Sequence, residues 1–66
     1  MRVRVNGDWT ELPALDTLAA LLDHLRIQHQ AVGILQNGQV VAREAFGATA
    51  VGDGDELEIV RFVGGG

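Results

Sequence analysis

One helical stripe of leucines stands in a chain whose other apolar runs are short and strand-like. Four leucines have the spacing i, i+3, i+4 and i+7 of a single helix face, namely Leu18, Leu21, Leu22 and Leu25. Asp16 precedes them and is the expected N-cap, because its carboxylate can accept hydrogen bonds from the free amides of the first turn. A lone amphipathic helix must bury its leucines against something, and strands are what the rest of the sequence offers.

Two Asn-Gly pairs predict two hairpins, because this dipeptide supplies the positive φ angles of a two-residue hairpin turn. Asn6-Gly7 separates the alternating run "MRVRV" from "DWTEL", which Pro13 ends. Asn37-Gly38 separates "AVGIL" from "VVA". Residues 43–51 have no clean period and are expected to be connecting structure that tucks Phe46 beneath it.

The segment that follows "GDGD" is predicted to be the last strand. Leu57 and Ile59 alternate with two glutamates, so that the apolar and the acidic residues take opposite faces. The alternation then breaks, because Val60 and Phe62 share the parity of the glutamates. These two residues are either core at a twisted edge or an exposed patch that a partner covers, and the pattern leaves both interpretations open.

The order of elements is strand, strand, helix, strand, strand or irregular segment, strand. One helix can cover one face of a mixed sheet, which predicts an α+β fold of the β-grasp, or ubiquitin-like, class. If the first and last strands are neighbours, complementary charges meet on the outer face, with Arg2 and Arg4 beside Glu56 and Glu58.

The composition excludes several function classes. The 66 residues have a net charge of −4, no cysteine and no lysine, and their five arginines are scattered. Without cysteine there is no disulfide, thiolate metal site or thiol nucleophile, and scattered arginines are a poor nucleic-acid footprint. No apolar run approaches the ~20 residues of a membrane span, and no signal-peptide core follows Met1. We therefore expect a soluble, cytoplasmic protein with neither nucleic acid nor membrane as partner.

We expect no active site within the chain. His24 and His29 are five residues apart and do not share a helix face, which favours polar surface residues over a metal site. "GDGDE" lacks the full ligand series of a calcium loop. Trp9 and Phe46 are expected to be packing residues rather than stacking platforms.

The ending "RFVGGG" is the main functional candidate. Glycines have no side chains to obstruct a narrow channel, and three of them extended reach about 10 Å. A carboxylate on Gly66 is ionised at neutral pH and is an oxyanion nucleophile for a nucleotide phosphate. A frayed or cloned end is the competing interpretation. We expect a β-grasp domain over residues 1–63 and a flexible glycine tail over residues 64–66.

Several segments together resemble the ThiS-type sulfur carrier proteins of thiamine biosynthesis. They are the "VNG" hairpin, "TLAALLDHL", "ILQNGQVVARE", "DGDELEIV" and the "RFVGGG" ending, and the last two carry most of the weight. The family has a β-grasp fold and is similar to the molybdopterin-type carriers and, more distantly, to ubiquitin. Its Gly-Gly ending is matched by Gly65 and Gly66, and Gly64 extends it.

The resemblance implies a carrier that serves as co-substrate, not an enzyme. A ThiF-like E1-type adenylyltransferase would use ATP and magnesium to turn the Gly66 carboxylate into an acyl-adenylate, and sulfur from a cysteine desulfurase would give a thiocarboxylate. A ThiG-like thiazole synthase would accept that sulfur while building the thiazole phosphate. No permanently bound cofactor is expected. Four residues before the glycines are expected to hold the tail against the activating enzyme, namely Val60, Arg61, Phe62 and Val63.

Three other functions remain open. A carrier for molybdopterin synthesis or tRNA thiolation would use the same tail chemistry. A ubiquitin-like modifier would form an isopeptide bond to a target lysine, although without lysine of its own it could not build ordinary lysine-linked self-chains. A plain interaction domain with an idle tail would be unchanged by deletion of Gly65 and Gly66.

Overall fold

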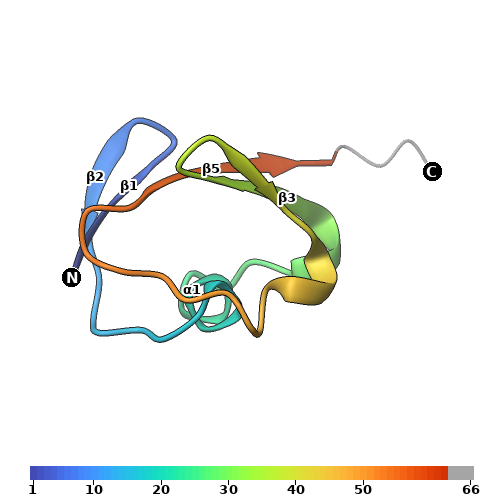
Figure 1. Ribbon diagram of the computed structural model, residues 1–66, viewed down its shortest axis with the longest axis horizontal. Coiled ribbons are helices and arrows are strands. Elements are labelled where there is room, and N and C mark those ends of the chain that lie inside the picture. Colours follow the sequence, from blue (N-terminus) through green and yellow to red (C-terminus); the bar gives the residue numbers. More distant parts are fainter. Residues whose placement is uncertain (63–66) are drawn as a thin grey trace.

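Across residues 1–62, five strands form one mixed sheet, and a single α-helix lies across one of its faces (Figure 1). The computed structural model describes residues 1–62. Its elements are β1 (Arg2–Val5), β2 (Asp8–Glu11), α1 (Leu18–His24), η1 (His29–Ala31), β3 (Val32–Gln36), β4 (Gln39–Val41), η2 (Arg43–Ala45) and β5 (Glu56–Arg61), where η denotes a 3-10 helix. The order across the sheet is β2-β1-β5-β3-β4. The predicted β-grasp arrangement is confirmed.

The strand that comes last in the sequence lies in the middle of the sheet. β5 runs parallel to β1 on one side and antiparallel to β3 on the other. The remaining pairs, β1 with β2 and β3 with β4, are the two antiparallel hairpins that the Asn-Gly pairs predict. Asn6 and Gly7 have φ angles of 49° and 87°, and Asn37 and Gly38 have 50° and 84°, as this turn requires.

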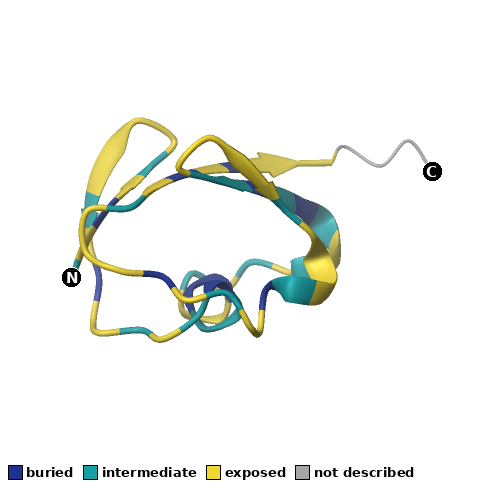
Figure 2. Cartoon of the chain, viewed as in Figure 1, coloured by how far each residue is buried: buried dark blue, intermediate teal, exposed yellow. Residues whose placement is uncertain are grey.

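The core lies between α1 and the inner face of the sheet. Three of the four predicted leucines, Leu18, Leu21 and Leu22, are fully buried. The fourth, Leu25, is the C-cap of α1 and is partly buried against the same core. The leucines pack with apolar residues of the strands and loops, which are Val3, Leu12, Val32, Ile34, Phe46, Val51, Leu57 and Ile59. Phe46 is 2% exposed beneath the connecting segment, also as predicted. Figure 2 shows that buried residues line the space between helix and sheet while much of the outer surface is exposed.

The predicted N-cap at Asp16 is wrong by one residue. Thr17 is the N-cap: its backbone is extended, and its hydroxyl oxygen accepts a hydrogen bond from Ala20 N at 3.2 Å. Thr17 also forms an isolated β-bridge with Ala50, which sets the point where the chain turns into the helix. Asp16 is exposed and contributes its carbonyl oxygen, which accepts from Val51 N at 3.1 Å.

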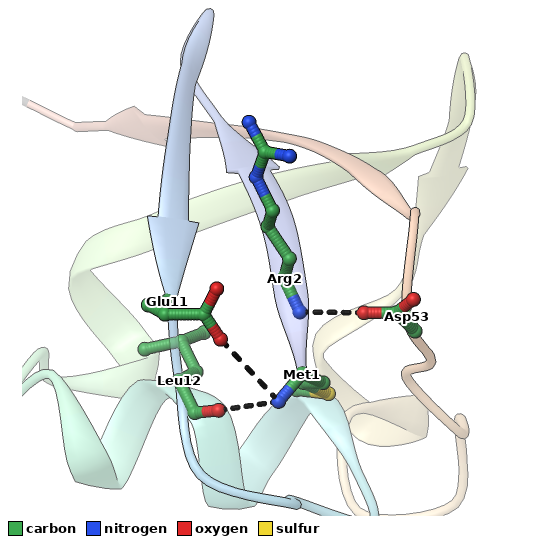
Figure 3. A network of polar contacts seen from close by, with 5 residues as sticks. All are labelled: Met1, Arg2, Glu11, Leu12 and Asp53. Atoms are coloured by element: carbon green, nitrogen blue, oxygen red, sulfur yellow. Dashed lines mark hydrogen bonds and ion pairs between the residues drawn. The ribbon is translucent and has the colours of Figure 1, made fainter.

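Polar contacts fix the start of the chain next to the end of β2 and the turn before β5 (Figure 3). The Met1 ammonium donates to Leu12 O at 2.6 Å and lies 3.9 Å from the Glu11 carboxylate. Arg2 N donates to Asp53 Oδ1 at 2.6 Å. These contacts join β1 both to the end of its hairpin and to the turn that precedes β5.

A cluster of hydrogen bonds around Asp55 joins the second hairpin to the start of β5. The Asp55 carboxylate accepts hydrogen bonds from Gly52 N at 2.9 Å, Gln36 Nε2 at 3.1 Å and Asn37 Nδ2 at 3.2 Å. Partial burial by itself would raise the pKa of this carboxyl, but the three hydrogen bonds outweigh it and lower the pKa below its usual 3.8. The folded state therefore favours ionised Asp55.

This pKa shift predicts a pH-dependent contribution to stability. The pKa of Asp55 is lower in the folded than in the unfolded chain. Its contribution to stability is therefore present above pH 3.8 and is lost as the pH falls through the folded pKa. We expect wild type to have a higher Tm than Asp55→Asn at about pH 6, and the difference to shrink steadily below pH 3.8. Thermal unfolding followed by circular dichroism measures this. A difference that stays constant across the acid range would contradict the assignment.

Candidate functional site

The end of β5 carries the residues predicted to bind a partner. Val60 and Arg61 are the last two residues of β5, and Phe62 follows directly. The other predicted site residues, Val63 and the glycines 64–66, lie outside the described residues. The described part of the candidate site therefore ends at Phe62.

Val60 and Phe62 are exposed, which excludes the interpretation that they are core at a twisted edge. Their exposed fractions are 44% and 60%. Both lie on the face of the sheet that carries Glu56 and Glu58, opposite the face that packs on α1. No other element of residues 1–62 covers this open face, so apolar side chains on it stay in contact with solvent.

Phe62 is nonetheless held in place. Its backbone N donates to Ala31 O at 2.8 Å, so the pairing with β3 continues one residue beyond β5. Its ring lies across Gly33 of β3: a Cβ atom on Gly33 would be 3.1 Å from the ring Cζ. The sequence alone does not point to Gly33, because the contact depends on the register of two strands far apart in sequence.

The exposed apolar surface extends across β3 to β4. Val40 is 81% exposed and faces Leu35 in the register of the second hairpin. Leu35 in turn is opposite Glu58 and lies diagonal to Val60 on the open face. We call this surface the open-face patch, and it consists of Leu35, Val40, Val60 and Phe62. The run "VVA" is apolar throughout and has no alternation, so it gave no signal that Val40 would be exposed.

The other half of the open face is organised around Trp9. The prediction that Trp9 is a packing residue is wrong in the sense of core packing, because the ring is 48% exposed on β2. The guanidinium groups of Arg2 and Arg4 lie 4.9 Å and 5.9 Å from its ring centroid. Trp9 is opposite Arg4 in the hairpin register and so lies on the uncovered face of the sheet.

The predicted charge pairing across β1 and β5 is partly correct. The two strands are neighbours, and Arg4 is opposite Glu56 as expected. Arg2 is opposite Glu11 on β2 instead, and among residues 1–62 no ion pair joins either arginine to Glu56 or Glu58. The guanidinium groups lie on Trp9 instead, which offers them a cation–π contact.

The remaining polar groups do not assemble a reaction centre in the part of the chain that the structure describes. His29 Nε2 lies 2.9 Å from Asp23 Oδ1 and is partly buried against the edge of the Phe46 ring, whereas His24 is exposed. No three potential metal ligands gather within residues 1–62. A hollow of about 320 Å³ between the two hairpins is lined by Arg4, Glu56 and Glu58, all exposed. No described helix is long and apolar enough to cross a membrane.

An added methyl group at Gly33 should move the Phe62 ring. The added Cβ would lie 3.1 Å from Cζ of the ring, which is tighter than ordinary van der Waals contact, so the ring must shift by a few tenths of an ångström. We expect Gly33→Ala to change the NMR shifts of the Phe62 ring protons while Tm changes by less than about 5 °C. Gly47→Ala is the matched control, because a Cβ there meets nothing within 4 Å. Unchanged Phe62 signals in Gly33→Ala would show that the ring does not lie on Gly33.

A family model and several known proteins match this chain. The ThiS family model matches residues 3–66. The crystal structure of a thiamine biosynthesis protein (ThiS) from Geobacter metallireducens has a TM-score of 0.84 and 39% identity, with 100% of both chains covered. An NMR solution structure of a thiamine biosynthesis protein from the same organism has a TM-score of 0.81 and 39% identity, covering 100% of this chain and 88% of the other.

Two curated relatives are named thiazole synthase. They come from Paramagnetospirillum magneticum and Magnetococcus marinus and are 38% and 35% identical to this chain over 66 residues. Those residues are 100% of this chain but 20% of each relative, so the chain spans about a fifth of the length of the curated relatives it matches.

Proposed function

Because this chain belongs to the ThiS family, we propose that it is a sulfur carrier of thiamine biosynthesis whose Gly66 carboxylate becomes a thiocarboxylate. The observation that carries the proposal is the family match, which runs through Gly66 and includes the Gly-Gly ending. The fold agrees with it, because β5 leads from the centre of the sheet directly into that ending. The chain would act as a co-substrate of other enzymes.

The proposed chemistry explains why an activating enzyme is needed. A carboxylate is a poor electrophile, since its attacked carbon carries no good leaving group. Attack of a Gly66 carboxylate oxygen on the α-phosphorus of ATP would release pyrophosphate and leave an acyl-adenylate. A sulfur nucleophile would then displace AMP, so that one oxygen of the carboxylate is replaced by sulfur. ATP and magnesium belong to the activating enzyme in this scheme, and the sulfur would come through a cysteine desulfurase.

The open-face patch is the proposed docking surface for the ThiF-like adenylyltransferase. Val60 and Phe62 come just before the glycine tail in the sequence. A partner that covers their side chains would therefore also contact Arg61, Val63 and the glycines. Exposed aromatic and aliphatic side chains that a partner desolvates are typical anchors of a protein interface. Phe62 is the strongest candidate, because its ring is both exposed and held on Gly33.

A thiazole synthase is the proposed acceptor of the sulfur. The support comes from the two relatives of that name, in which a segment like this chain makes up a fifth of the polypeptide. Joining the two functions in one chain raises the effective concentration of one for the other. We therefore propose a ThiG-like thiazole synthase as the second partner.

The first prediction from this function concerns the mass of the protein. A form that ends at Gly66, incubated with the ThiF-like enzyme of its genome, ATP, magnesium and a sulfide source, should gain the mass of one oxygen replaced by sulfur. Intact-mass spectrometry measures it. The matched control lacks Gly66 and should gain nothing. An unchanged mass, with the same enzyme active on another carrier, would contradict the proposal and favour a modifier or an interaction domain.

The second prediction concerns Phe62. Loss of an anchoring aromatic ring costs about 1.4 kcal/mol or more, so Phe62→Ala should raise the KM of adenylation for the carrier at least tenfold. Trp9→Ala, which removes an exposed ring on the edge strand β2, two strands away from β5, should stay within about twofold of wild type. Pyrophosphate release measures both. Wild-type kinetics for Phe62→Ala would withdraw the patch as the docking surface.

A further inference from the structure

β5 loses its neighbour on one side before the strand ends. β1 pairs with β5 at Arg4 opposite Glu56 and Val5 opposite Leu57, and Asn6 N then donates to Leu57 O at 2.9 Å. The chain turns away at Asn6-Gly7 into β2. In Figure 1 the β1–β2 hairpin accordingly lies beside the first part of β5, and the end of β5 runs on past it.

The side chain of Asn6 supplies one more partner beyond the last backbone pair. Its Oδ1 accepts from Ile59 N at 2.7 Å, and its Nδ2 donates to Ile59 O at 3.1 Å. A carboxamide has the same donor and acceptor as a peptide group, so Asn6 takes the place that a strand residue would occupy. The backbone of Ile59 is thereby satisfied.

The next residue on this side, Arg61, has its backbone groups free at an edge. In an antiparallel pair, hydrogen-bonded and non-bonded residues alternate. Asn37 N donates to Glu56 O and Phe62 N donates to Ala31 O, so the even-numbered residues of β5 bond to the β3 side. Arg61 therefore directs its N–H and C=O away from β3, and within residues 1–62 no strand or side chain follows Asn6 there.

We propose that the adenylyltransferase adds an extended segment of its own to this edge of β5, pairing with the backbone of Arg61. The inference rests on the proposed function and assigns how the enzyme binds the strand. A free strand edge is recognised by another strand through main-chain hydrogen bonds. The sequence beyond it favours the same mode, because three glycines offer a partner no side chains to recognise. Val60 and Phe62 of the open-face patch flank Arg61 in the sequence and supply apolar contacts next to this edge.

Amide hydrogen exchange gives a residue-level test. In the free protein Arg61 N–H should exchange fast, while Ile59 N–H, bonded to Asn6, and Phe62 N–H, bonded to Ala31, exchange slowly. Saturation with the enzyme should slow exchange at Arg61 at least about tenfold. A saturated complex in which Arg61 exchanges as fast as before overturns the inference. Protection of Arg61 that grows with the concentration of the carrier alone overturns it too, because a second copy would then occupy the edge.

A pair of variants separates the backbone from the side chain. Arg61→Ala removes the guanidinium but keeps the N–H, whereas Arg61→Pro removes both. Proline is tolerated on an edge strand where the N–H faces away from the sheet, and slow exchange at Ile59 and Phe62 verifies the fold. We expect the KM of adenylation to be at least about fivefold higher for Arg61→Pro than for Arg61→Ala, the effect of losing one hydrogen bond. Equal values overturn the inference alone, whereas a wild-type protein that the enzyme neither binds nor adenylates overturns the proposed function.

Discussion

The insertion of β5 between β1 and β3 is the pairing on which the rest of the structure depends. β5 has five register pairs with β3 and two with β1, and its inner residues Leu57 and Ile59 meet the leucines of α1. Without it the two hairpins would be separate two-stranded units, which are marginally stable on their own. Because the last strand is central, whatever follows it in the sequence is joined to the central strand of the sheet.

Within residues 1–62 the chain covers one face of this sheet and leaves the other to solvent. Small domains bury a limited fraction of their surface, and here α1 with its connecting loops suffices for the inner face. The outer face divides into two halves with different chemistry: Trp9 with the arginines on β2 and β1, and the open-face patch on β4, β3 and β5. Under the proposed function, the apolar half serves to bind the activating enzyme, because it includes the residues that precede the Gly66 ending in the sequence.

Local signals were sufficient to predict the elements and the fold class, and they failed where two distant segments decide a side chain's surroundings. The Asn-Gly turns, the leucine face and the burial of Phe46 follow from neighbours in sequence or from simple alternation. Asp16 and Thr17 are both residue types that favour the N-cap position. Thr17 is the N-cap because its β-bridge with Ala50 sets the point at which the chain enters the helix. Alternation likewise placed Phe62 on the acidic face, but its seat on Gly33 depends on strand register.

The two asparagines illustrate most clearly what a local reading of the sequence misses. In each Asn-Gly pair the asparagine and the glycine adopt the left-handed backbone of the turn, as the dipeptide itself predicts. The asparagine side chains then both reach β5, Asn6 to the backbone of Ile59 and Asn37 to Glu56 N at 2.9 Å. Glycine at either position would keep the turn but lose the contact with β5, and aspartate would lose the donor group. The same residues therefore define the hairpins and clamp the central strand from both sides. Since the Asn6 clamp ends at Ile59, it also determines that the free edge of β5 begins at Arg61.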